Sequence, residues 1–184
     1  MRKAAILALF LFTAAGLAGC GDFAPPADTQ AVPAASQQIP AEREATLRLY
    51  LPDEDGMHVS LRESKVPAKQ MTLKNALVQL IRLDREQKYP LLPTGLTIKD
   101  VSIEDGTAVI NFSGQLKNLS GGTTAQGLFI AMFVNTATEF PNVRQVVFKM
   151  EGQPVTGFTG HYDMTQPFKR NEGMIRMENQ IDHI

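Results

Sequence analysis

The sequence has no tryptophan and only one cysteine, Cys20, among its 184 residues. A single cysteine cannot form an internal disulfide, so the fold has to be stable without one. Basic and acidic side chains are almost balanced, at 18 and 19, and they form neither a basic stripe for nucleic acid nor a polybasic patch for anionic lipid. Apolar runs also stay below the roughly 20 residues of a membrane-spanning helix. We therefore expect no disulfide scaffold, no nucleic-acid partner and no transmembrane helix.

An apolar stretch at residues 4–17 directly follows two basic residues at the start of the chain. Its length and position are typical of the core of a signal peptide. It ends in Leu-Ala-Gly-Cys at 17–20, which resembles the lipobox of bacterial lipoproteins, where the cysteine is acylated and the chain is cut before it. We therefore predict a lipoprotein signal peptide at residues 1–19 and membrane lipid attached through acylated Cys20. The alternative is an ordinary cysteine inside a transmembrane anchor.

Residues 20–45 are dominated by Ala, Pro, Gln and Ser, and their few apolar residues show no periodicity. Such a segment cannot bury enough apolar surface to offset the entropy lost on ordering. We predict a disordered tether that spans roughly 25–30 Å on average. Because two or more acyl chains hold a protein durably on a bilayer, the expected location is the extracytoplasmic face of a bacterial membrane.

The part that follows residue 45 begins with the pattern of a β-hairpin and then a helix. TLRLYL at 46–51 alternates leucines with other side chains, as a half-buried strand does. PDEDG at 52–56 has the composition of a turn, and 58–62 is a plausible returning strand. Thr72 opens a helix whose apolar residues recur at helical spacing: Leu73, Ala76, Leu77, Leu80 and Ile81.

A second hairpin and a second helix are predicted further along. In residues 96–113, apolar and polar side chains alternate on both sides of Asp105-Gly106, a dipeptide favoured in tight hairpin turns. Thr123 and Gln126 have the spacing of a capping box and predict the start of a helix. The apolar face of this helix is expected to hold Leu128, Phe129, Met132, Phe133 and Phe140, and a last strand should cover residues 143–150.

The resulting order is β-β-α-β-β-α-β. Two amphipathic helices need a partner surface, which one face of a mixed or antiparallel sheet can supply. We therefore predict a single α+β domain with both helices packed on one face of one sheet. Residues 166–184 are predicted to be a C-terminal tail with a frayed end, although its apolar residues could instead bind a partner: Met174, Ile175 and Met177.

The sequence contains only weak motifs for catalysis or for metal and phosphate binding. Three histidines are scattered without the spacing of a zinc site: His58, His161 and His183. The acidic run Asp53, Glu54 and Asp55 lacks the twelve-residue calcium loop and is predicted to be a solvated turn. Neither a G-x-S-x-G nucleophile elbow nor a phosphate-binding loop is present. We predict no enzymatic activity, no catalytic or metal site and no cofactor.

Three stretches resemble the GerMN domain, named for sporulation and spore germination proteins and common in bacterial lipoproteins. They are RLYLPDEDG, LLPTGLTIKDVSIEDGTAVINFS and NTATEFPNVRQVVFKMEGQP, and the resemblance extends over residues 46–165. Its most specific part is T-x-T-E-F-P-x-V-x-x-V, where the second helix meets the last strand. This sequence shows a single copy without an appended catalytic domain, and it has Asn111 where relatives often carry Asp.

The resemblance implies an α+β fold similar to the ring-building motifs of secretion-system proteins. It also implies a non-enzymatic interaction or assembly module in the cell envelope, which binds an envelope protein or itself. Some relatives are attached to cell-wall amidases, so an accessory that binds peptidoglycan or wall-remodelling enzymes is the first alternative. An enzyme of unrecognised type is the second, and it would need a polar cleft with convergent carboxylates.

Overall fold

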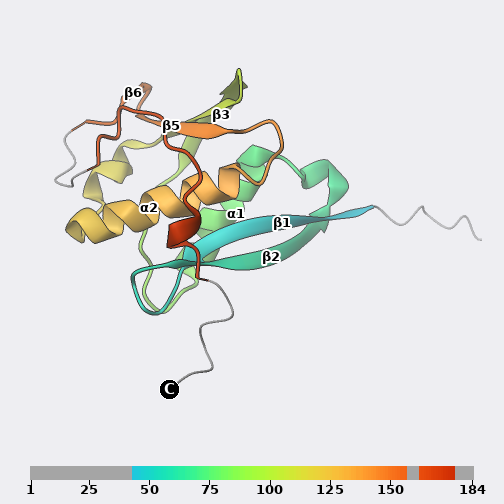
Figure 1. Cartoon of the computed structure of the whole chain (residues 1–184), viewed down its shortest axis with the longest axis horizontal. Helices are drawn as coiled ribbons and strands as arrows, with labels where there is room; N and C mark the ends of the chain where they lie inside the picture. The colour runs from blue at the N-terminus through green and yellow to red at the C-terminus, as the bar shows by residue number, and fades with distance from the viewer. Residues whose placement is uncertain (1–42, 157–161, 177–184) are drawn as a thin grey trace, which may run out of the picture. The chain divides into compact units, whose positions relative to one another are not determined.

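The computed structural model describes residues 43–156 and 162–176 (Figure 1). The predicted signal peptide, Cys20 and almost all of the predicted tether lie outside these residues, as do His161, Met177 and His183. No helix in the described part is long and apolar enough to cross a membrane. The strands and helices are β1 Glu44–Pro52, β2 Val59–Pro67, α1 Leu73–Arg85, β3 Ile98–Glu104, β4 Thr107–Phe112, α2 Gly122–Ala137, β5 Gln145–Met150 and β6 Gln153–Pro154.

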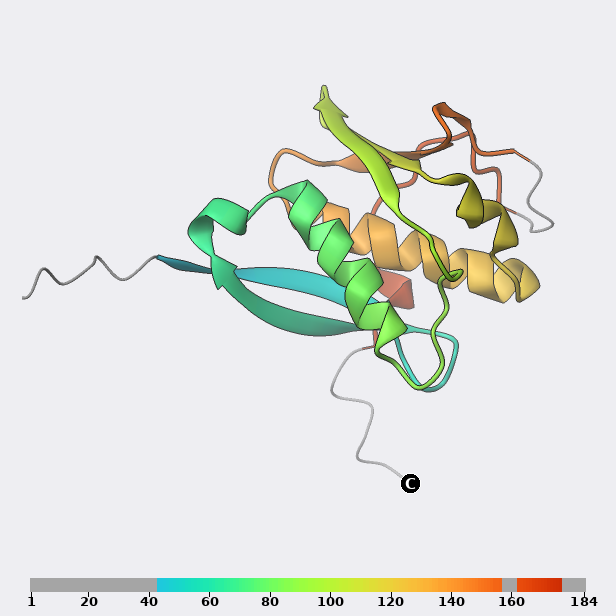
Figure 2. The same cartoon turned by 180° about the vertical axis from the view of Figure 1, so that it is seen from behind.

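This order confirms the predicted α+β domain, with the two-residue β6 as an addition. The strands form two sheets, however, where we expected one. β1 and β2 make an antiparallel pair, and β3-β4-β5-β6 make a mixed sheet in which β4 and β5 run parallel. Figures 1 and 2 show the helices between the hairpin and the larger sheet, so both helices are covered from two sides.

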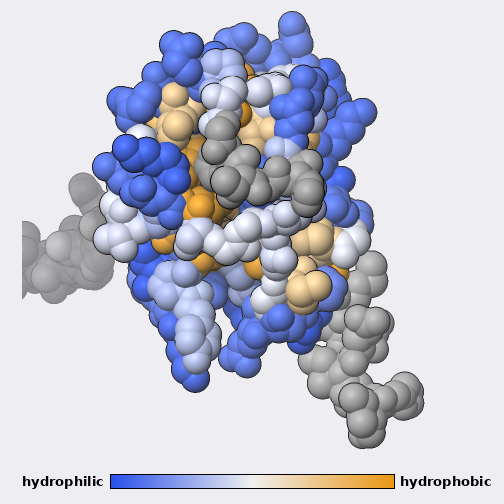
Figure 3. Space-filling model, turned by 90° about the vertical axis from the view of Figure 1, so that its left-hand side faces the viewer, coloured by the Kyte–Doolittle hydropathy of each residue, from blue (hydrophilic) through white to orange (hydrophobic). Residues whose placement is uncertain are grey.

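The second helix explains this arrangement. Every residue of α2 from position 125 to 137 is buried, so over this length α2 is buried on all sides rather than on one face as predicted. A helix of this kind needs cover around its whole circumference, which one sheet cannot provide. The hairpin β1–β2 therefore packs on the side of α2 that the four-stranded sheet leaves open. The face where α2 begins, on the left of Figure 1, has apolar residues near its middle and hydrophilic residues around them (Figure 3).

The predicted capping box of α2 is wrong. The helix begins at Gly122, and its N-cap is Gly121, which has a positive φ of 100° and makes no capping bond through a side chain. A Cβ on this residue would lie 2.8 Å from the Cβ of Ala125, so only glycine fits. Gln126 is buried instead of capping, and its Nε2 donates to the carbonyl of Tyr162 at 3.2 Å. Phe140 lies beyond the end of the helix.

Four phenylalanines form the centre of the core. Phe129 and Phe133 of α2 face Phe112 of β4 and Phe148 of β5, with ring centroids between 4.8 and 6.5 Å apart. All four are fully buried, which confirms the two members that helical spacing predicted. The apolar face of α1 is also confirmed, and the Thr72 hydroxyl accepts from the backbone N–H of Asn75 at 3.2 Å.

The C-terminal segment is not frayed over residues 166–176. Phe168 forms an antiparallel bridge with Val146 of β5, and Ile175 forms a parallel bridge with Val59 of β2. Phe168, Met174 and Ile175 pack on the hydrophobic core as partly buried side chains. Local sequence patterns do not reveal these contacts, because each joins two segments that are far apart in the chain. The segment consequently forms one wall of a groove.

Candidate functional site

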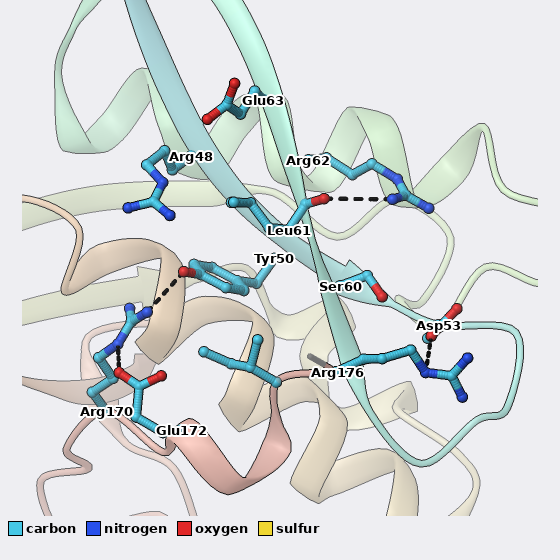
Figure 4. A pocket seen from close by; sticks show the side chains of 11 residues that line it. Arg48, Tyr50, Asp53, Ser60, Leu61, Arg62, Glu63, Arg170, Glu172 and Arg176 are labelled. Atoms are coloured by element: carbon cyan, nitrogen blue, oxygen red, sulfur yellow. Dashed lines mark hydrogen bonds and ion pairs between the residues drawn. The ribbon is translucent and has the colours of Figure 1, made fainter. Parts of the chain in front are cut away.

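A groove of about 750 Å³ lies where the hairpin β1–β2 meets the C-terminal segment (Figure 4). Its walls carry four arginines, three acidic side chains and Tyr50. The register of the hairpin pairs Arg48 with Glu63 and Tyr50 with Leu61. Side chains of paired residues lie on the same face of a sheet, so these four line one face of the hairpin. The odd-numbered leucines of β1 consequently point to the core.

Tyr50 is the centre of a polar network at one end of the groove. Its hydroxyl donates to Glu139 Oε1 at 2.7 Å and accepts from Arg170 Nη2 at 2.7 Å. Burial raises the pKa of the Tyr50 hydroxyl, and its hydrogen bond to Glu139 raises it further. The guanidinium of Arg170 also lies over the Tyr50 ring, 5.1 Å from its centroid, a distance that allows cation–π attraction. Tyr50 therefore stays neutral and acts as a bridge between two charges.

Arg170 holds the C-terminal segment against the end of α2. Its Nη1 donates to the carbonyl of Asn135 at 3.0 Å, and its Nε donates to Glu172 at 2.5 Å. The same guanidinium lies 3.0 Å from Glu139 Oε1, while Arg48 Nη1 donates to the other oxygen of Glu139 at 3.0 Å. Burial alone would lower the pKa of Arg170, but the bonds to Glu172 and Tyr50 outweigh it and raise the pKa. This arginine is fixed in its charged form.

At the other end of the groove the predicted turn is exposed at residues 54–57, but two of its carboxylates also bind the C-terminal segment. Arg176 lies 2.6 Å from Asp53 Oδ2 and 2.5 Å from Asp55 Oδ2, and His58 Nδ1 lies 2.7 Å from Asp55 Oδ2. The side chains of Asp53 and Asp55 are only 13 % and 25 % exposed. Burial would raise the pKa of Asp55, but hydrogen bonds from His58, Met57 and Arg176 hold it well below its usual value. The acidic turn is thus a docking point for the C-terminal segment.

The groove contains acidic groups, but most of them are already paired. Asp53 and Glu172 each contact an arginine of the C-terminal segment, as does Glu139 behind Tyr50. A carboxylate that is already paired with a guanidinium has fewer free lone pairs with which to bind a ligand. In the described ranges, no three metal-ligating side chains lie close enough to hold an ion. The arrangement is suited to joining segments and to presenting polar groups.

Two further residues carry structural roles that the sequence did not reveal. Asp84 near the end of α1 is fully buried and accepts from the backbone N–H groups of Leu91 and Leu92 at 3.1 and 2.9 Å. Burial raises the pKa of Asp84, although these two bonds oppose the rise. Asn111 Oδ1 accepts from the N–H of Gly152 at 2.8 Å. A carboxylate could accept the same bond, so the Asp that the family resemblance implies at this position would keep this contact.

Little in the sequence could have located the groove. A tyrosine on the polar face of a strand is a weak signal for a buried polar contact, and Tyr50 was such a residue. Arg170 gave no signal because it lies 120 residues from Tyr50 in a segment without periodicity. Of the residues considered for metal binding, His58, Asp53 and Asp55 lie together, but Arg176 occupies the space between the two carboxylates.

Comparison with known proteins identifies the family. The Germane family model, described as sporulation and spore germination, matches residues 48–156. The structure of the first GerMN domain of the sporulation protein GerM from Bacillus subtilis superposes with a TM-score of 0.54 at 23 % identity, covering 70 % of this chain and 98 % of that one. The tandem GerMN domains of the same protein also give a TM-score of 0.54 at 23 % identity, covering 66 % of this chain.

This chain spans 45 % of the tandem structure. Identities this low support the fold alone, and no curated protein matches the chain. The family model, in contrast, covers more than half of the sequence, including the hairpin, both helices and the mixed sheet. The chain therefore belongs to the Germane family of sporulation and spore germination, and it contains a GerMN domain.

Proposed function

We propose that this protein is a membrane-anchored extracytoplasmic lipoprotein whose GerMN domain is a non-enzymatic interaction or assembly module in the cell envelope. The process it serves is sporulation or germination. The observation that carries the non-enzymatic part is the groove, whose carboxylates at Asp53 and Glu172 are neutralised by arginines of the same chain. The family description also names a process rather than a reaction.

The anchor follows from Leu-Ala-Gly-Cys at residues 17–20. A serine hydroxyl cannot replace the thiolate in forming a thioether, so Cys20→Ser should abolish lipid attachment. Metabolic labelling with a palmitate analogue should mark the wild-type chain and leave the variant unlabelled. Equal labelling of both chains would reject the lipoprotein part of the proposal.

Tethering has a mechanistic purpose in this scheme. A linker of about 25 residues reaches at most ~90 Å when extended, which confines the domain to a thin layer beside the membrane. Confinement raises the effective concentration of partners in that layer, so a weak interface is sufficient. The partner is then an envelope protein or a second copy of the chain.

A pair of strains tests this mechanism. One strain secretes the domain without its anchor, and the other carries the domain on an unrelated lipobox and linker. We expect the second strain to complement a deletion and the first to fail. Full complementation by the untethered domain would contradict the role of confinement, and cleavage of muropeptides by the purified chain would contradict the non-enzymatic role.

A peptidoglycan-binding accessory remains the second candidate, and one observation favours it. Among the residues that the structure describes, Arg62 in the groove wall has one hydrogen bond, from its guanidinium to the carbonyl of its neighbour Leu61 at 3.4 Å. A guanidinium without an acidic partner could receive a carboxylate of a wall peptide. Co-sedimentation with purified sacculi, compared between wild type and Arg62→Ala, would separate the two candidates.

A further inference from the structure

The outer edge of β2 in the hairpin β1–β2 has no strand partner within the described part of the chain. The bonds that close its ends run from Asp53 N to His58 O at 2.8 Å and from Ala68 N to Arg43 O at 2.7 Å. Backbone groups alternate between the two sides of an antiparallel strand, so the even-numbered residues of β2 bond to β1. The odd-numbered residues direct their N–H and C=O groups away from the hairpin. These outward residues are Leu61, Glu63 and Lys65.

An independent contact confirms this alternation. Arg176 N donates to Val59 O at 2.9 Å, and Val59 is an odd-numbered residue on the same outer edge. The C-terminal segment thus occupies the first position of the edge, where Ile175 pairs with Val59. Beyond that position, the described residues place no further backbone partner on the edge. Figures 1 and 2 show β2 as the outermost strand, with β1 between it and the helices.

The charges along this edge restrict how a second copy could pair with it. Two copies related by a twofold axis run antiparallel, and each possible register places one residue of β2 opposite its own equivalent. If that residue is Arg62, Glu63 or Lys65, two like charges face each other, which is unfavourable. If it is Ser64, a neutral residue lies on the axis. Glu63 of each copy then faces Lys65 of the other.

The C-terminal segment selects the same register. With Ser64 on the axis, Pro67 of one copy lies opposite Leu61 of the other. The strand ends there, because the chain continues into the 3₁₀ turn Ala68–Gln70, and Val59 stays free for Ile175. Pro67 has no N–H to leave unpaired, and its carbonyl can accept from Leu61. Registers centred on Arg62 or Glu63 would instead extend the partner strand over the position that Ile175 occupies.

We propose that two copies of this chain associate through β2, antiparallel and with Ser64 on the twofold axis, to join their hairpins into one four-stranded sheet. Charged residues on an edge strand usually prevent such pairing, but in this register Glu63 and Lys65 form reciprocal ion pairs. The proposal rests on the proposed function and names its self-association surface. The interface is small, so it depends on the confinement of both copies to one membrane.

Cysteine substitution reports the register directly. Equivalent residues on the axis form a pair without backbone bonds between them, with Cα atoms about 4.5 Å apart, which is within the range of a disulfide. Ser64→Cys in the full chain should therefore crosslink to its own equivalent when membranes are oxidised with copper phenanthroline. Arg62→Cys is the matched control, because it lies on the same face of β2 and is more exposed, yet its equivalents would be roughly 13 Å apart.

Charge reversal tests the ion pairs. In the Ser64→Cys background, Lys65→Glu places acidic groups opposite each other at both ends of the contact and should lower the crosslinked fraction roughly tenfold. Adding Glu63→Lys restores opposite charges and should restore the crosslink. The parent chain, which carries only Cys20, is the blank for every sample, and reduced samples should melt like the parent.

The expected result is a crosslink from Ser64→Cys that exceeds both the parent and Arg62→Cys and that follows the charge reversals. Equal yields from positions 62 and 64, no yield above the parent, or insensitivity to Lys65→Glu would each overturn the proposal. Muropeptide cleavage or complementation by an untethered domain would reject the proposed function and would leave the crosslinking result as it stands.

Discussion

The phenylalanine cluster and the groove network stabilise the same domain by opposite means. The cluster of Phe112, Phe129, Phe133 and Phe148 is apolar, fully buried and built from neighbouring elements of the mixed sheet and α2. The network around Tyr50, Glu139 and Arg170 is polar and partly exposed, and it joins the hairpin to the C-terminal segment. The cluster determines whether the domain folds, whereas the network determines whether its last segment stays in place.

The two regions contribute unequally to the free energy of folding. Large apolar side chains contribute most of the free energy of folding through burial and packing. Partly exposed ion pairs contribute less, because water and salt screen them. Substitutions in the two regions should therefore differ in size and in their response to pH.

The largest loss of stability is expected from a substitution in the phenylalanine cluster. Phe133→Ala leaves a cavity among three other phenylalanine rings and should reduce the free energy of unfolding by about 3–5 kcal/mol. Chemical denaturation of the chain would measure the loss. Val78→Ala, on the exposed face of α1, serves as the control. A loss below about 1 kcal/mol for Phe133→Ala would show that the cluster does not dominate stability.

Removing one arginine of the network should have a smaller effect. Arg170→Met keeps an apolar stem but deletes the bonds to Tyr50 and Asn135, with an expected loss of about 2 kcal/mol. Arg48→Met is a matched control, because Arg48 contacts the same Glu139. Its side chain is 49 % exposed against 27 % for Arg170, so its loss should stay below about 1 kcal/mol. Equal losses would mean that burial does not distinguish the two arginines.

The contribution of the acidic turn to the free energy of unfolding should depend on pH. The pKa of Asp55 in the folded chain lies below its ordinary value of 3.8, so its ionised form stabilises the fold. This contribution is fully present above the ordinary pKa and is lost as pH falls through the folded pKa. The difference in free energy of unfolding between wild type and Asp55→Asn should therefore shrink at low pH. Glu54→Gln, an exposed acid of the same turn, is the control, and a constant difference would contradict the prediction.

The smallest effect is expected at Asn111. Asn111→Asp keeps an oxygen that accepts from Gly152 and should change the free energy of unfolding by less than about 0.5 kcal/mol. Asn111→Ala removes the acceptor and should cost about 1 kcal/mol. Thermal melts of the three proteins would rank them, and a larger loss for the aspartate than for the alanine would contradict this account.

Local patterns were enough to predict the order of the strands and helices. Alternation located β1 and the hairpin at Asp105, and helical spacing located the buried face of α1, because both depend on neighbours in sequence. The interior position of α2 was missed because periodicity alone does not distinguish a helix covered on one side from one covered on all sides. The groove was missed for another reason. Its walls are joined by contacts between Tyr50 and Arg170 and between Asp53 and Arg176, and no local pattern encodes such pairs.

The separation of 120 residues between Tyr50 and Arg170 also determines the order in which the domain can be completed. The chain is synthesised from its N-terminus, so β1 and β2 exist long before Arg170 and Arg176 do. Contacts between distant segments form slowly because a long loop must close first. Tyr50 therefore lacks its contact with Arg170 until the last segment of the chain is available. A chain cut short before Arg170 would retain its phenylalanine cluster and expose the groove wall to proteases.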